Sequence, residues 1–446
     1  MKLNATLRKI ADITGGKLTG GNPDAPITAF VTDSRVVTAT DGFIALKGAR
    51  FDAHDFIPDV LTRKAAVIIA RQDYPVPAQA ESPFILVDDT LKALQALAKY
   101  HRLNSTLKVA AITGSNGKST TKQMLRAICL QAGETVANMG NLNNQFGVPF
   151  SLLEIQPKHK YGVFELGASH PGDILETASL AVPDVAVITN VGPSHLEFFH
   201  DLETVYKTKT EIAQCLNYGG TLVYNLDDAL LSRLHLDYKG KALSFGFSPQ
   251  ADVQILETEK FAFTYKGEAY LFDINLERHD KLNAAAACAA AIALGIYMDA
   301  IKQGLASFTP MPMRLERIQK GNTQFILDCY NANPASMKNA LEILGRSSAP
   351  RIAVLGDMKE LGKTSKEYHR AVARQVLDSG ADYVFLAGPE MKYCYEHLQD
   401  TTGLKVWYGD TPAEWLSALQ KAVQRGGTCL LKASRSMNFE AVFKEL

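Results

Sequence analysis

A short glycine-rich stretch near residue 115 has the residue types that bind phosphate. An apolar segment, residues 109–113, leads into Gly-Ser-Asn-Gly-Lys-Ser-Thr at residues 114–120, and a helix-compatible segment follows. Glycines let successive backbone N–H groups converge on phosphate oxygens, and the start of a helix favours negative charge. In such a loop Lys118 reaches the terminal phosphates and Ser119 binds Mg²⁺. The pattern predicts a nucleotide-binding loop, although the full pattern has another glycine where this chain has Ile112. The alternative is a glycine-rich turn that binds nothing.

Further polar residues follow other predicted strands. Glu165 ends an apolar segment, where a carboxylate suits a Mg²⁺ ligand as well as it suits a helix cap or a solvated side chain. Asn190 and His195 follow the strand-like segment 184–190. In an open α/β sheet, ligands bind beyond the carboxyl ends of the strands. We therefore expect both residues to lie near the phosphates, although a lone histidine is otherwise more often structural.

Two segments, residues 138–149 and 328–334, are dense in asparagine. Such residues favour polar turns, and their amides also suit hydrogen bonds to phosphate or substrate, so both interpretations stay open. Lys207 and Lys209 lie on a predicted helix, residues 205–216. From the residue types alone, these lysines can either have a chemical role or simply face solvent on the outer side of the helix.

The order of strands and helices predicts how these residues are positioned. After the glycine-rich loop, strand-like segments alternate with helical ones, which is typical of a parallel sheet with crossover helices. Pro310 and Pro312 interrupt this pattern and predict a hinge, and βα units resume after them. We predict an α/β protein of three domains. They are a small N-terminal α/β domain (residues 1–84), a central P-loop ATPase domain with a parallel sheet (residues 85–313), and a C-terminal Rossmann-like domain (residues 314–446).

The composition argues against several classes of protein. Lys+Arg and Asp+Glu both number 47 in the 446 residues, so no basic excess indicates nucleic acid or an anionic membrane. The six cysteines form no C-x-x-C pair, which fits a reducing cytosol better than disulfides or zinc. The first 20 residues lack the apolar run of a secretory signal, and the apolar run 284–296 is too short to span a bilayer. We expect a cytoplasmic protein without membrane insertion, and we predict a buried helix for residues 284–296.

With these motifs identified, the chain resembles the Mur ligases, the ATP-dependent amide-forming enzymes of peptidoglycan synthesis. Residues 113–120 are similar to the family's Thr-Gly-x-Asn-Gly-Lys-[Ser/Thr]-Thr loop, and residues 140–144, Glu165 and His195 follow in the family's order. More specific similarity lies in three C-terminal segments, residues 330–337, 355–362 and 432–436. Similarity to the family's UDP-sugar-binding domain lies in residues 33–35, 45–48 and 52–56.

The resemblance implies an ATP-dependent carbon–nitrogen ligase. The C-terminal segments, together with residues 165–172, are most similar to the members that join D-alanyl-D-alanine to UDP-N-acetylmuramoyl-tripeptide through an acyl phosphate. ATP and Mg²⁺ are the expected cofactors, those two small molecules are the expected partners, and we expect a monomer. The alternatives are another Mur-type amide ligase and a P-loop kinase or NTPase. A nucleotide-binding module without turnover is a more distant alternative.

The resemblance also implies roles for individual residues. It implies three catalytic residues, Lys118, His195 and Lys209, and four metal ligands, Ser119, Glu165, His195 and Lys209, with Lys209 as a lysine carbamate. It implies nucleotide contacts from Gly114, Ser115, Asn116, Gly117, Lys118, Ser119, Thr120, Asn283, Arg314, Asp328, Tyr330 and Asn331. It implies substrate contacts from Ser34, Arg35, Lys47, His54, Asn141, Asn143 and Asn144. The chain departs from the family at Asp280, where asparagine is usual, and at Thr210, where glycine is usual.

Overall fold

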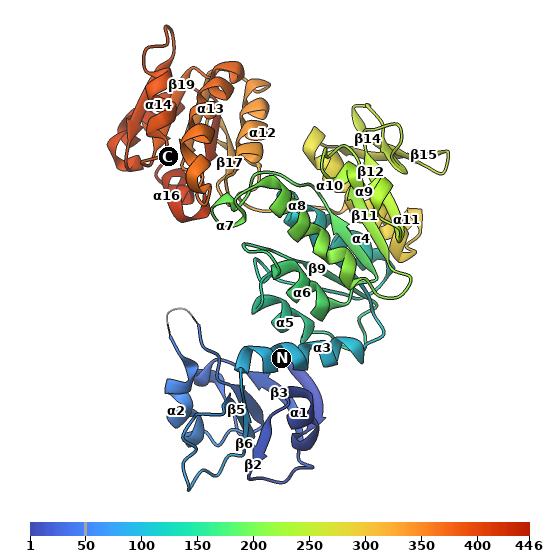
Figure 1. The fold of residues 1–446 in the computed structure, drawn as a ribbon. Helices are drawn as coiled ribbons and strands as arrows, with labels where there is room; N and C mark the ends of the chain where they lie inside the picture. Colours follow the sequence, from blue (N-terminus) through green and yellow to red (C-terminus); the bar gives the residue numbers. More distant parts are fainter. Residues whose placement is uncertain (49–50) are drawn as a thin grey trace.

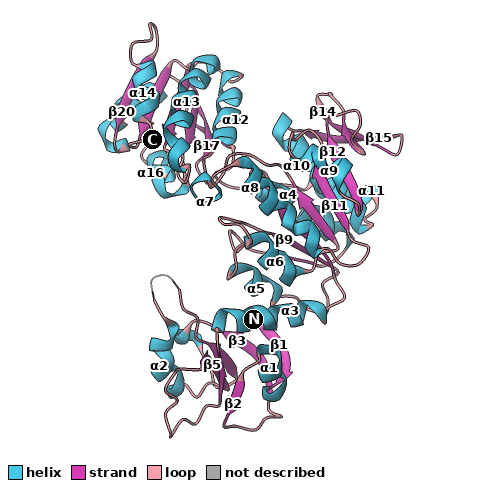
Figure 2. Ribbon diagram, in the orientation of Figure 1, coloured by secondary structure: helices cyan, strands magenta, loops and turns pink. Residues whose placement is uncertain are grey.

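The computed structural model describes residues 1–48 and 51–446. These residues form three β-sheets of six, nine and six strands, with helices between the strands (Figure 1 and Figure 2). The chain builds the sheets one after another, and we name the N-terminal, central and C-terminal units after them. This architecture confirms the predicted α/β fold class. Among the described residues, no helix is long and apolar enough to cross a membrane.

The N-terminal unit is built on a sheet with the strand order β1-β3-β4-β5-β6-β2. Its strands are β1 (Lys2–Thr6), β2 (Lys17–Thr19), β3 (Pro26–Val31), β4 (Asp41–Ile44), β5 (Val67–Arg71) and β6 (Phe84–Val87). Strands β3 to β6 run parallel, and the edge strands β1 and β2 run antiparallel to their neighbours. The helices are α1 (Leu7–Thr14) and α2 (Ile57–Thr62).

Helix α3 (Thr90–Leu103) joins the N-terminal unit to the central one. Its residues Leu94 and Leu97 are fully buried in an apolar cluster that includes Ile85 of the N-terminal sheet and Ala111 of the central sheet. The core therefore passes through α3 without a break. Packing alone does not divide the chain here, and the domain boundary after residue 84 stays a prediction.

The central unit carries a nine-stranded sheet in the order β15-β14-β13-β12-β11-β10-β7-β9-β8. Its strands are β7 (Lys108–Thr113), β8 (Thr135–Ala137), β9 (Tyr161–Glu165), β10 (Val185–Ile188), β11 (Thr221–Asn225), β12 (Lys241–Gly246), β13 (Val253–Ile255), β14 (Lys260–Tyr265) and β15 (Glu268–Asn275). Strands β7 to β13 are parallel, as predicted. Strands β14 and β15 instead form an antiparallel hairpin that the sequence analysis did not predict. Its two turn residues, Lys266 and Gly267, have φ of +50° and +81°, the left-handed geometry that tight hairpin turns need.

Helices cover both faces of the central sheet. They are α4 (Lys118–Ala132), α5 (Gly147–Leu152), α6 (Asp173–Ala181), α7 (Leu196–Phe199), α8 (Leu202–Thr210), α9 (Leu234–Asp237), α10 (Arg278–Leu294) and α11 (Met298–Ala306). In β7 the side chains alternate: Val109 and Ala111 face the cluster that contains α3, α5 and α6, and Ala110 and Ile112 face α4, α10 and α11. The predicted buried helix is α10, whose alanine-rich run is fully buried.

The C-terminal unit has a six-stranded sheet in the order β16-β17-β21-β18-β19-β20. Its strands are β16 (Glu316–Lys320), β17 (Thr323–Asp328), β18 (Arg351–Gly356), β19 (Tyr383–Ala387), β20 (Lys405–Gly409) and β21 (Gly427–Lys432), of which only β16 is antiparallel to its neighbour. Its helices are α12 (Pro334–Gly345), α13 (Ser365–Ser379), α14 (Lys392–Leu398), α15 (Leu416–Val423) and α16 (Phe439–Lys444). In Figure 1 this unit lies at the end of the molecule opposite the N-terminal sheet.

Candidate active site

The glycine-rich loop links β7 to α4 and depends on its two glycines. Gly114 has φ of +148°, and a Cβ there would lie 1.9 Å from Thr189 Oγ1. Gly117 has φ of +79°, and a Cβ there would lie 2.2 Å from Asn283 Oδ1. Any other residue at either position would clash. Helix α4 starts at Lys118 without a side-chain cap, so its first N–H groups are available to an anion.

The residues that follow β10 hold this loop in place. Asn190 Oδ1 accepts a hydrogen bond from Asn116 N at 2.9 Å, and Asn190 Nδ2 donates to Asn116 O at 3.1 Å. Thr189 Oγ1 donates to the same carbonyl at 2.6 Å, and Ser115 Oγ donates to Gly192 O at 2.9 Å. Asn190 thus lies beside the loop, as expected, but its amide shapes the loop backbone.

Lys118 lies over the loop that it follows. Its Nζ donates to Gly114 O at 2.7 Å and to Ser115 O at 3.3 Å. Burial lowers the pKa of Lys118, the negative charge of Glu165 opposes this shift, and the charge of Arg314 adds to it. A desolvated cation of this kind interacts strongly with phosphate, because little water screens it.

Glu165, at the end of β9, is the anionic centre of the site. It is 3% exposed, and its Oε2 accepts a hydrogen bond from Ser119 Oγ at 2.7 Å while Oε1 accepts one from Asn143 Nδ2 at 2.9 Å. The Lys122 ammonium lies 3.6 Å from Oε2. Burial alone raises the pKa of Glu165, but the charges of Lys118 and Lys122 outweigh burial and hold this pKa below its usual value. The carboxylate is therefore ionised at neutral pH.

Ser119 and Glu165 offer the ligand types that Mg²⁺ prefers. An ionised carboxylate and a hydroxyl oxygen lie side by side, and hard cations bind oxygen. Over residues 1–48 and 51–446 no group of three or more His, Cys, Asp and Glu side chains forms a metal cage. The pair thus fits an ion that takes its other ligands from phosphate and water.

His195 connects the central unit to the C-terminal unit. Its Nδ1 lies 2.5 Å from Glu360 Oε2, and both residues have left-handed backbones, with φ of +52° and +64°. Hydrogen bonding to His195 lowers the pKa of Glu360. The backbones also meet, since Glu197 N donates to Glu360 O at 3.1 Å. The sequence analysis noted the segment that contains Glu360 but assigned this residue no role.

Lys209 is buried in the last turn of α8, whereas Lys207 is exposed. The predicted helix over residues 205–216 is in fact α8 followed by a short 3₁₀ helix, Glu211–Cys215. Lys209 is 2% exposed, and among the described residues its ammonium has no hydrogen bond or ion pair. Burial lowers the pKa of Lys209 well below its usual value, and the charge of Lys118 lowers it further. Lys207 therefore lies on a solvated helix face, whereas Lys209 does not.

The linker between the units brings Arg314 to the phosphate loop. Met313 and Leu315, on either side of it, have φ of +58° and +52°, a conformation that costs energy in residues other than glycine. Arg314 Nη2 donates to Ser119 Oγ at 3.0 Å, and its guanidinium stacks 4.2 Å from the centre of the Tyr330 ring. The strained linker thus delivers one cation from the C-terminal side to the Ser119 hydroxyl.

The segment after β17 contributes further polar groups. Lys432 Nζ lies 2.5 Å from Asp328 Oδ2 and donates to Asn331 O at 3.1 Å. Asn333 Nδ2 donates to Asn116 Oδ1 at 2.8 Å. The parallel pairing of β17 with β21, in which Asp328 faces Lys432, explains why residues 104 positions apart meet.

Most of the predicted site residues line two neighbouring cavities. A cavity of about 880 Å³ is lined by Ser115, Asn116, Gly117, Lys118, Ser119, Asn141, Asn143, Asn144, Glu165, His195, Lys209, Arg314, Asp328, Tyr330 and Asn331. We call it the central cavity. A cavity of about 320 Å³ shares part of this lining and adds Thr120 and Asn283. We call it the nucleotide cavity. Gly114 lies in the loop itself and lines neither.

Four predicted substrate-binding residues lie elsewhere, in the N-terminal unit. Arg35 is paired with Asp33 at 2.7 Å, next to Ser34. His54 is buried, with Nδ1 2.5 Å from Asp52 Oδ1 and Nε2 accepting from Arg71 N at 3.0 Å. Both ring nitrogens of His54 are thus used within the protein. Lys47 lies 3.7 Å from Asp52, just before the two residues outside the described chain.

The structure adds residues that the sequence analysis did not assign to the site. Lys122 and Asn138 support Glu165, the latter by hydrogen bonds to its backbone N and O at 2.9 and 2.8 Å. Glu360, Asn333 and Lys432 contribute from the C-terminal unit. Lys122 lies one helical turn after Lys118, a spacing that was available as a signal. Asn333, Glu360 and Lys432 lie in segments that the sequence analysis noted, but their contacts join residues far apart in the chain and could not be read from local sequence.

Comparison with known proteins gives matches along most of the chain. The family described as "Mur ligase family, catalytic domain" matches residues 26–102. "Mur ligase middle domain" matches residues 112–291, and "Mur ligase, glutamate ligase domain" matches residues 313–435.

Individual relatives are similar over the whole length. The UDP-N-acetylmuramoyl-tripeptide–D-alanyl-D-alanine ligase of Escherichia coli strain K12 is 35% identical, with 100% of this chain and 98% of the relative covered. A crystal structure of MurF from Acinetobacter baumannii has a TM-score of 0.92 at 33% identity, covering 100% and 99%. The MurF ligase of Thermotoga maritima in complex with ADP has a TM-score of 0.84 at 31% identity, covering 94% and 96%.

Proposed function

This chain belongs to the Mur ligase family, and we propose that it joins D-alanyl-D-alanine to UDP-N-acetylmuramoyl-tripeptide with the consumption of ATP. It is similar over its full length to ligases of that name and to a relative solved with ADP. One observation in this chain carries the proposal. The central cavity places the phosphate loop, an ionised Glu165 and the cations Lys118 and Arg314 between two units.

The chemistry of amide formation explains the charge of this cavity. A carboxylate is a poor electrophile, so transfer of the γ-phosphoryl group of ATP converts it to an acyl phosphate. The dipeptide amine then attacks the acyl carbon, inorganic phosphate leaves, and the amine gives up a proton. Carboxylate and triphosphate are both anions and repel each other. Lys118 and Lys122 lie near the carboxylate of Glu165, and Arg314 contacts Ser119 beside it. The positive charge of this group exceeds its negative charge and offsets that repulsion.

Ser119 and Glu165 are the residues that we propose for a Mg²⁺ site. When bound there, Mg²⁺ stabilises the negative charge on the phosphate oxygens. Asn143 and Asn138 keep the Glu165 carboxylate and backbone fixed. The Ser119 hydroxyl donates its proton to Glu165 and accepts a hydrogen bond from Arg314, which leaves one of its two lone pairs available to a metal.

Lys209 is proposed as a lysine carbamate. An ordinary lysine with a pKa of about 10.4 is a cation at neutral pH, and its charge opposes a nearby metal. Burial favours the neutral amine, which is the form that reacts with CO₂. A carbamate carries a negative charge and two oxygens, so it removes the repulsion from Lys118 and offers Mg²⁺ ligands. We propose that His195 and this group hold a second Mg²⁺.

The rest of the site is assigned by position. The nucleotide cavity adjoins the phosphate loop through Asn116 and Gly117, and we propose that Asn283, Thr120 and Asp328 contact the nucleoside there. Tyr330, with Arg314 stacked on it, and Asn331 complete the C-terminal side.

The UDP end of the other substrate is assigned to the N-terminal unit. We propose contacts from Ser34, Arg35, Lys47 and His54 there, with Asn141, Asn143 and Asn144 at the central end. We propose that the chain acts as a monomer. All six cysteines are free thiols, which supports a cytoplasmic location.

An ADP-release assay tests the function. Purified protein receives Mg-ATP with UDP-N-acetylmuramoyl-tripeptide, D-alanyl-D-alanine, both or neither, and the pentapeptide product is identified by mass spectrometry. We expect ADP only when both substrates are present. Steady ADP release without the dipeptide would indicate a kinase or NTPase, and product formation only with a single amino acid would indicate another Mur-type amide ligase.

A further inference from the structure

One side chain, Asn333, joins the first turn of α12 to the phosphate loop. Its Nδ2 donates to Asn116 Oδ1 at 2.8 Å. Its Oδ1 accepts from Ser336 N at 2.9 Å, and Asn333 N donates to Ser336 Oγ at 3.0 Å, so the same residue caps α12. One amide thus uses its oxygen for its own helix and its nitrogen for the neighbouring unit.

Asn116 is a fixed partner for this contact. Its backbone N–H is bonded to Asn190 and its carbonyl to Thr189, which leaves the residue little freedom to move. Asn333 is 6% exposed, so its amide is shielded from water, whereas Asn116 is partly exposed. Loss of one partner in such a place leaves a buried polar group unsatisfied, which costs more than loss of an exposed hydrogen bond.

We infer that Asn333 is a positioning residue that aligns α12 against the phosphate loop for turnover. The inference rests on the proposed ligase function. Ala335, Ser336 and Asn339 of α12 line the nucleotide cavity, and Asn116 lines it from the opposite unit. A shift of α12 relative to the loop therefore changes the shape of that cavity. The contact forms only when the C-terminal unit lies against the loop, so it couples the state of the loop to the docking of that unit.

The competing explanation is that Asn333 only caps α12. Substitutions with different side-chain chemistry distinguish this capping role from the proposed positioning role. Serine caps helices about as well as asparagine, but it is shorter and has no amide nitrogen to donate to Asn116. Asn333→Ser therefore keeps the cap and removes the contact between units. Asn333→Ala removes both. Asn116→Ala removes the acceptor and leaves the cap untouched.

The experiment compares these variants and the double variant Asn116→Ala/Asn333→Ser in the full-length protein. The readouts are kcat and KM for ATP, the melting temperature without ligand, and the radius of gyration by small-angle scattering with and without ADP plus the UDP-tripeptide. For Asn333→Ser we expect roughly a 3- to 10-fold loss of kcat, the range of one net hydrogen bond, with a smaller fall in melting temperature than in Asn333→Ala, because the cap is kept. We also expect less compaction on ligand binding. Asn333→Ala should show the same kinetic loss and a lower melting temperature.

The double variant tests whether the two residues act together. We expect it to be no slower than Asn116→Ala alone, because the contact is already lost. Wild-type kinetics and compaction in Asn333→Ser would overturn the inference, and so would a kinetic loss confined to Asn333→Ala or additive losses in the double variant. Failure of the wild type to release ADP with both substrates would instead refute the proposed function. The scattering and melting measurements need no turnover and still test the contact in that case.

Discussion

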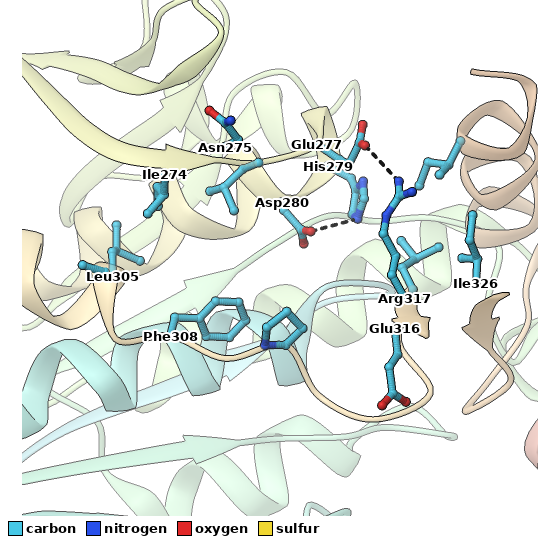
Figure 3. A pocket seen from close by; sticks show the side chains of 15 residues that line it. Ile274, Asn275, Glu277, His279, Asp280, Leu305, Phe308, Glu316, Arg317 and Ile326 are labelled. Carbon is cyan, nitrogen blue, oxygen red and sulfur yellow. Dashed lines mark hydrogen bonds and ion pairs between the residues drawn. The ribbon is translucent and has the colours of Figure 1, made fainter. Parts of the chain in front are cut away.

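Two cavities of similar size lie between the central and C-terminal units, and their linings differ in charge. The central cavity, of about 880 Å³, has a group of charges out of balance at the phosphate loop: Lys118 and Arg314 line the cavity beside Glu165, and buried Lys122 lies 3.6 Å from the Glu165 carboxylate. The other carboxylates of the lining, Asp173, Asp328 and Glu360, lie within 4 Å of His170, Lys432 and His195, respectively. The second cavity, of about 730 Å³, lies along the linker between the units, and we call it the hinge cavity (Figure 3). Its walls are largely apolar and include Ile274, Leu305, Phe308 and Ile326.

Charged groups are also present in the hinge cavity, but four of them lie in pairs, and the fifth, Glu316, accepts a hydrogen bond from Met313 N at 2.8 Å. Arg317 lies 3.4 Å from Glu277, and His279 lies 3.3 Å from Asp280, as Figure 3 shows. Both cavities contain charged residues, so the presence of charge does not by itself identify a reaction site. Unbalanced, desolvated charge is costly and is kept where it acts on a ligand, whereas paired charge beside apolar walls serves the packing of a hinge.

The largest effect should come from Lys118→Ala, which removes a cation from the unbalanced cluster. We expect turnover to fall by about 1,000-fold or more, because Lys118 acts on charge that develops at the phosphates. Affinity for the UDP-tripeptide should stay close to wild type, since the uridine end is assigned to the N-terminal unit. ADP release and titration calorimetry measure the two quantities. Turnover near the wild-type rate would show that the loop is not the phosphate site.

Lys209→Ala should follow, with a loss of about 100-fold or more if the residue supplies a carbamate. Added formate or acetate should restore part of the activity, because a small carboxylate fits the vacated space. Lys207→Ala is the matched control: it lies two residues earlier on α8, is exposed, and should lose little. Equal losses in the two variants, or full activity in Lys209→Ala, would leave Lys209 without a chemical role.

Glu165→Gln should give an intermediate effect and identify the proposed metal site. The amide keeps the size of the side chain and removes its charge, so we expect the Mg²⁺ concentration for half-maximal rate to rise about 10-fold or more. The melting temperature should fall, because buried Lys122 loses the carboxylate beside it, so the Mg²⁺ dependence is the readout for the metal site. Rates are measured across a Mg²⁺ titration at fixed ATP. An unchanged Mg²⁺ dependence would remove Glu165 from the set of metal ligands.

The sequence predicted the fold and the site unevenly, for physical reasons. The predicted segments 109–113 and 184–190 match β7 and β10 to within two residues, because buried parallel strands are short apolar runs bounded by turn residues. The β14–β15 hairpin was missed although aromatic or aliphatic residues alternate along both strands, because its turn, Lys266-Gly267, is not one of the strong hairpin pairs such as Asn-Gly. The glycine-rich loop could be recognised in the sequence because all its parts are consecutive, and its role in phosphate binding stays a prediction.

Contacts between units could not be read from local patterns. The pairs His195–Glu360 and Asn116–Asn333 join segments more than 160 residues apart, and their formation depends on the linker geometry. That geometry includes left-handed backbones at Met313 and Leu315, which neither residue type favours. Similarly, the distinction between Lys207 and Lys209 needed the packing of α8, because both lie on one predicted helix.

The smallest effect should come from Arg317→Gln in the hinge cavity. Arg317 and Glu277 are each 42% exposed, so water screens their attraction, and such pairs contribute about 0–1 kcal/mol to stability. Glutamine keeps most of the side-chain length, and Glu277 left alone still reaches solvent. We expect kcat and KM within about twofold of wild type and a change in the free energy of unfolding below about 1 kcal/mol. Both are measured beside Glu165→Gln, which also replaces a charged group by an amide. Arg317→Gln would slow turnover as much as Glu165→Gln only if the paired charges at the hinge mattered to the reaction as much as the unbalanced charges at the phosphate loop. That result would contradict the proposed difference between the two cavities.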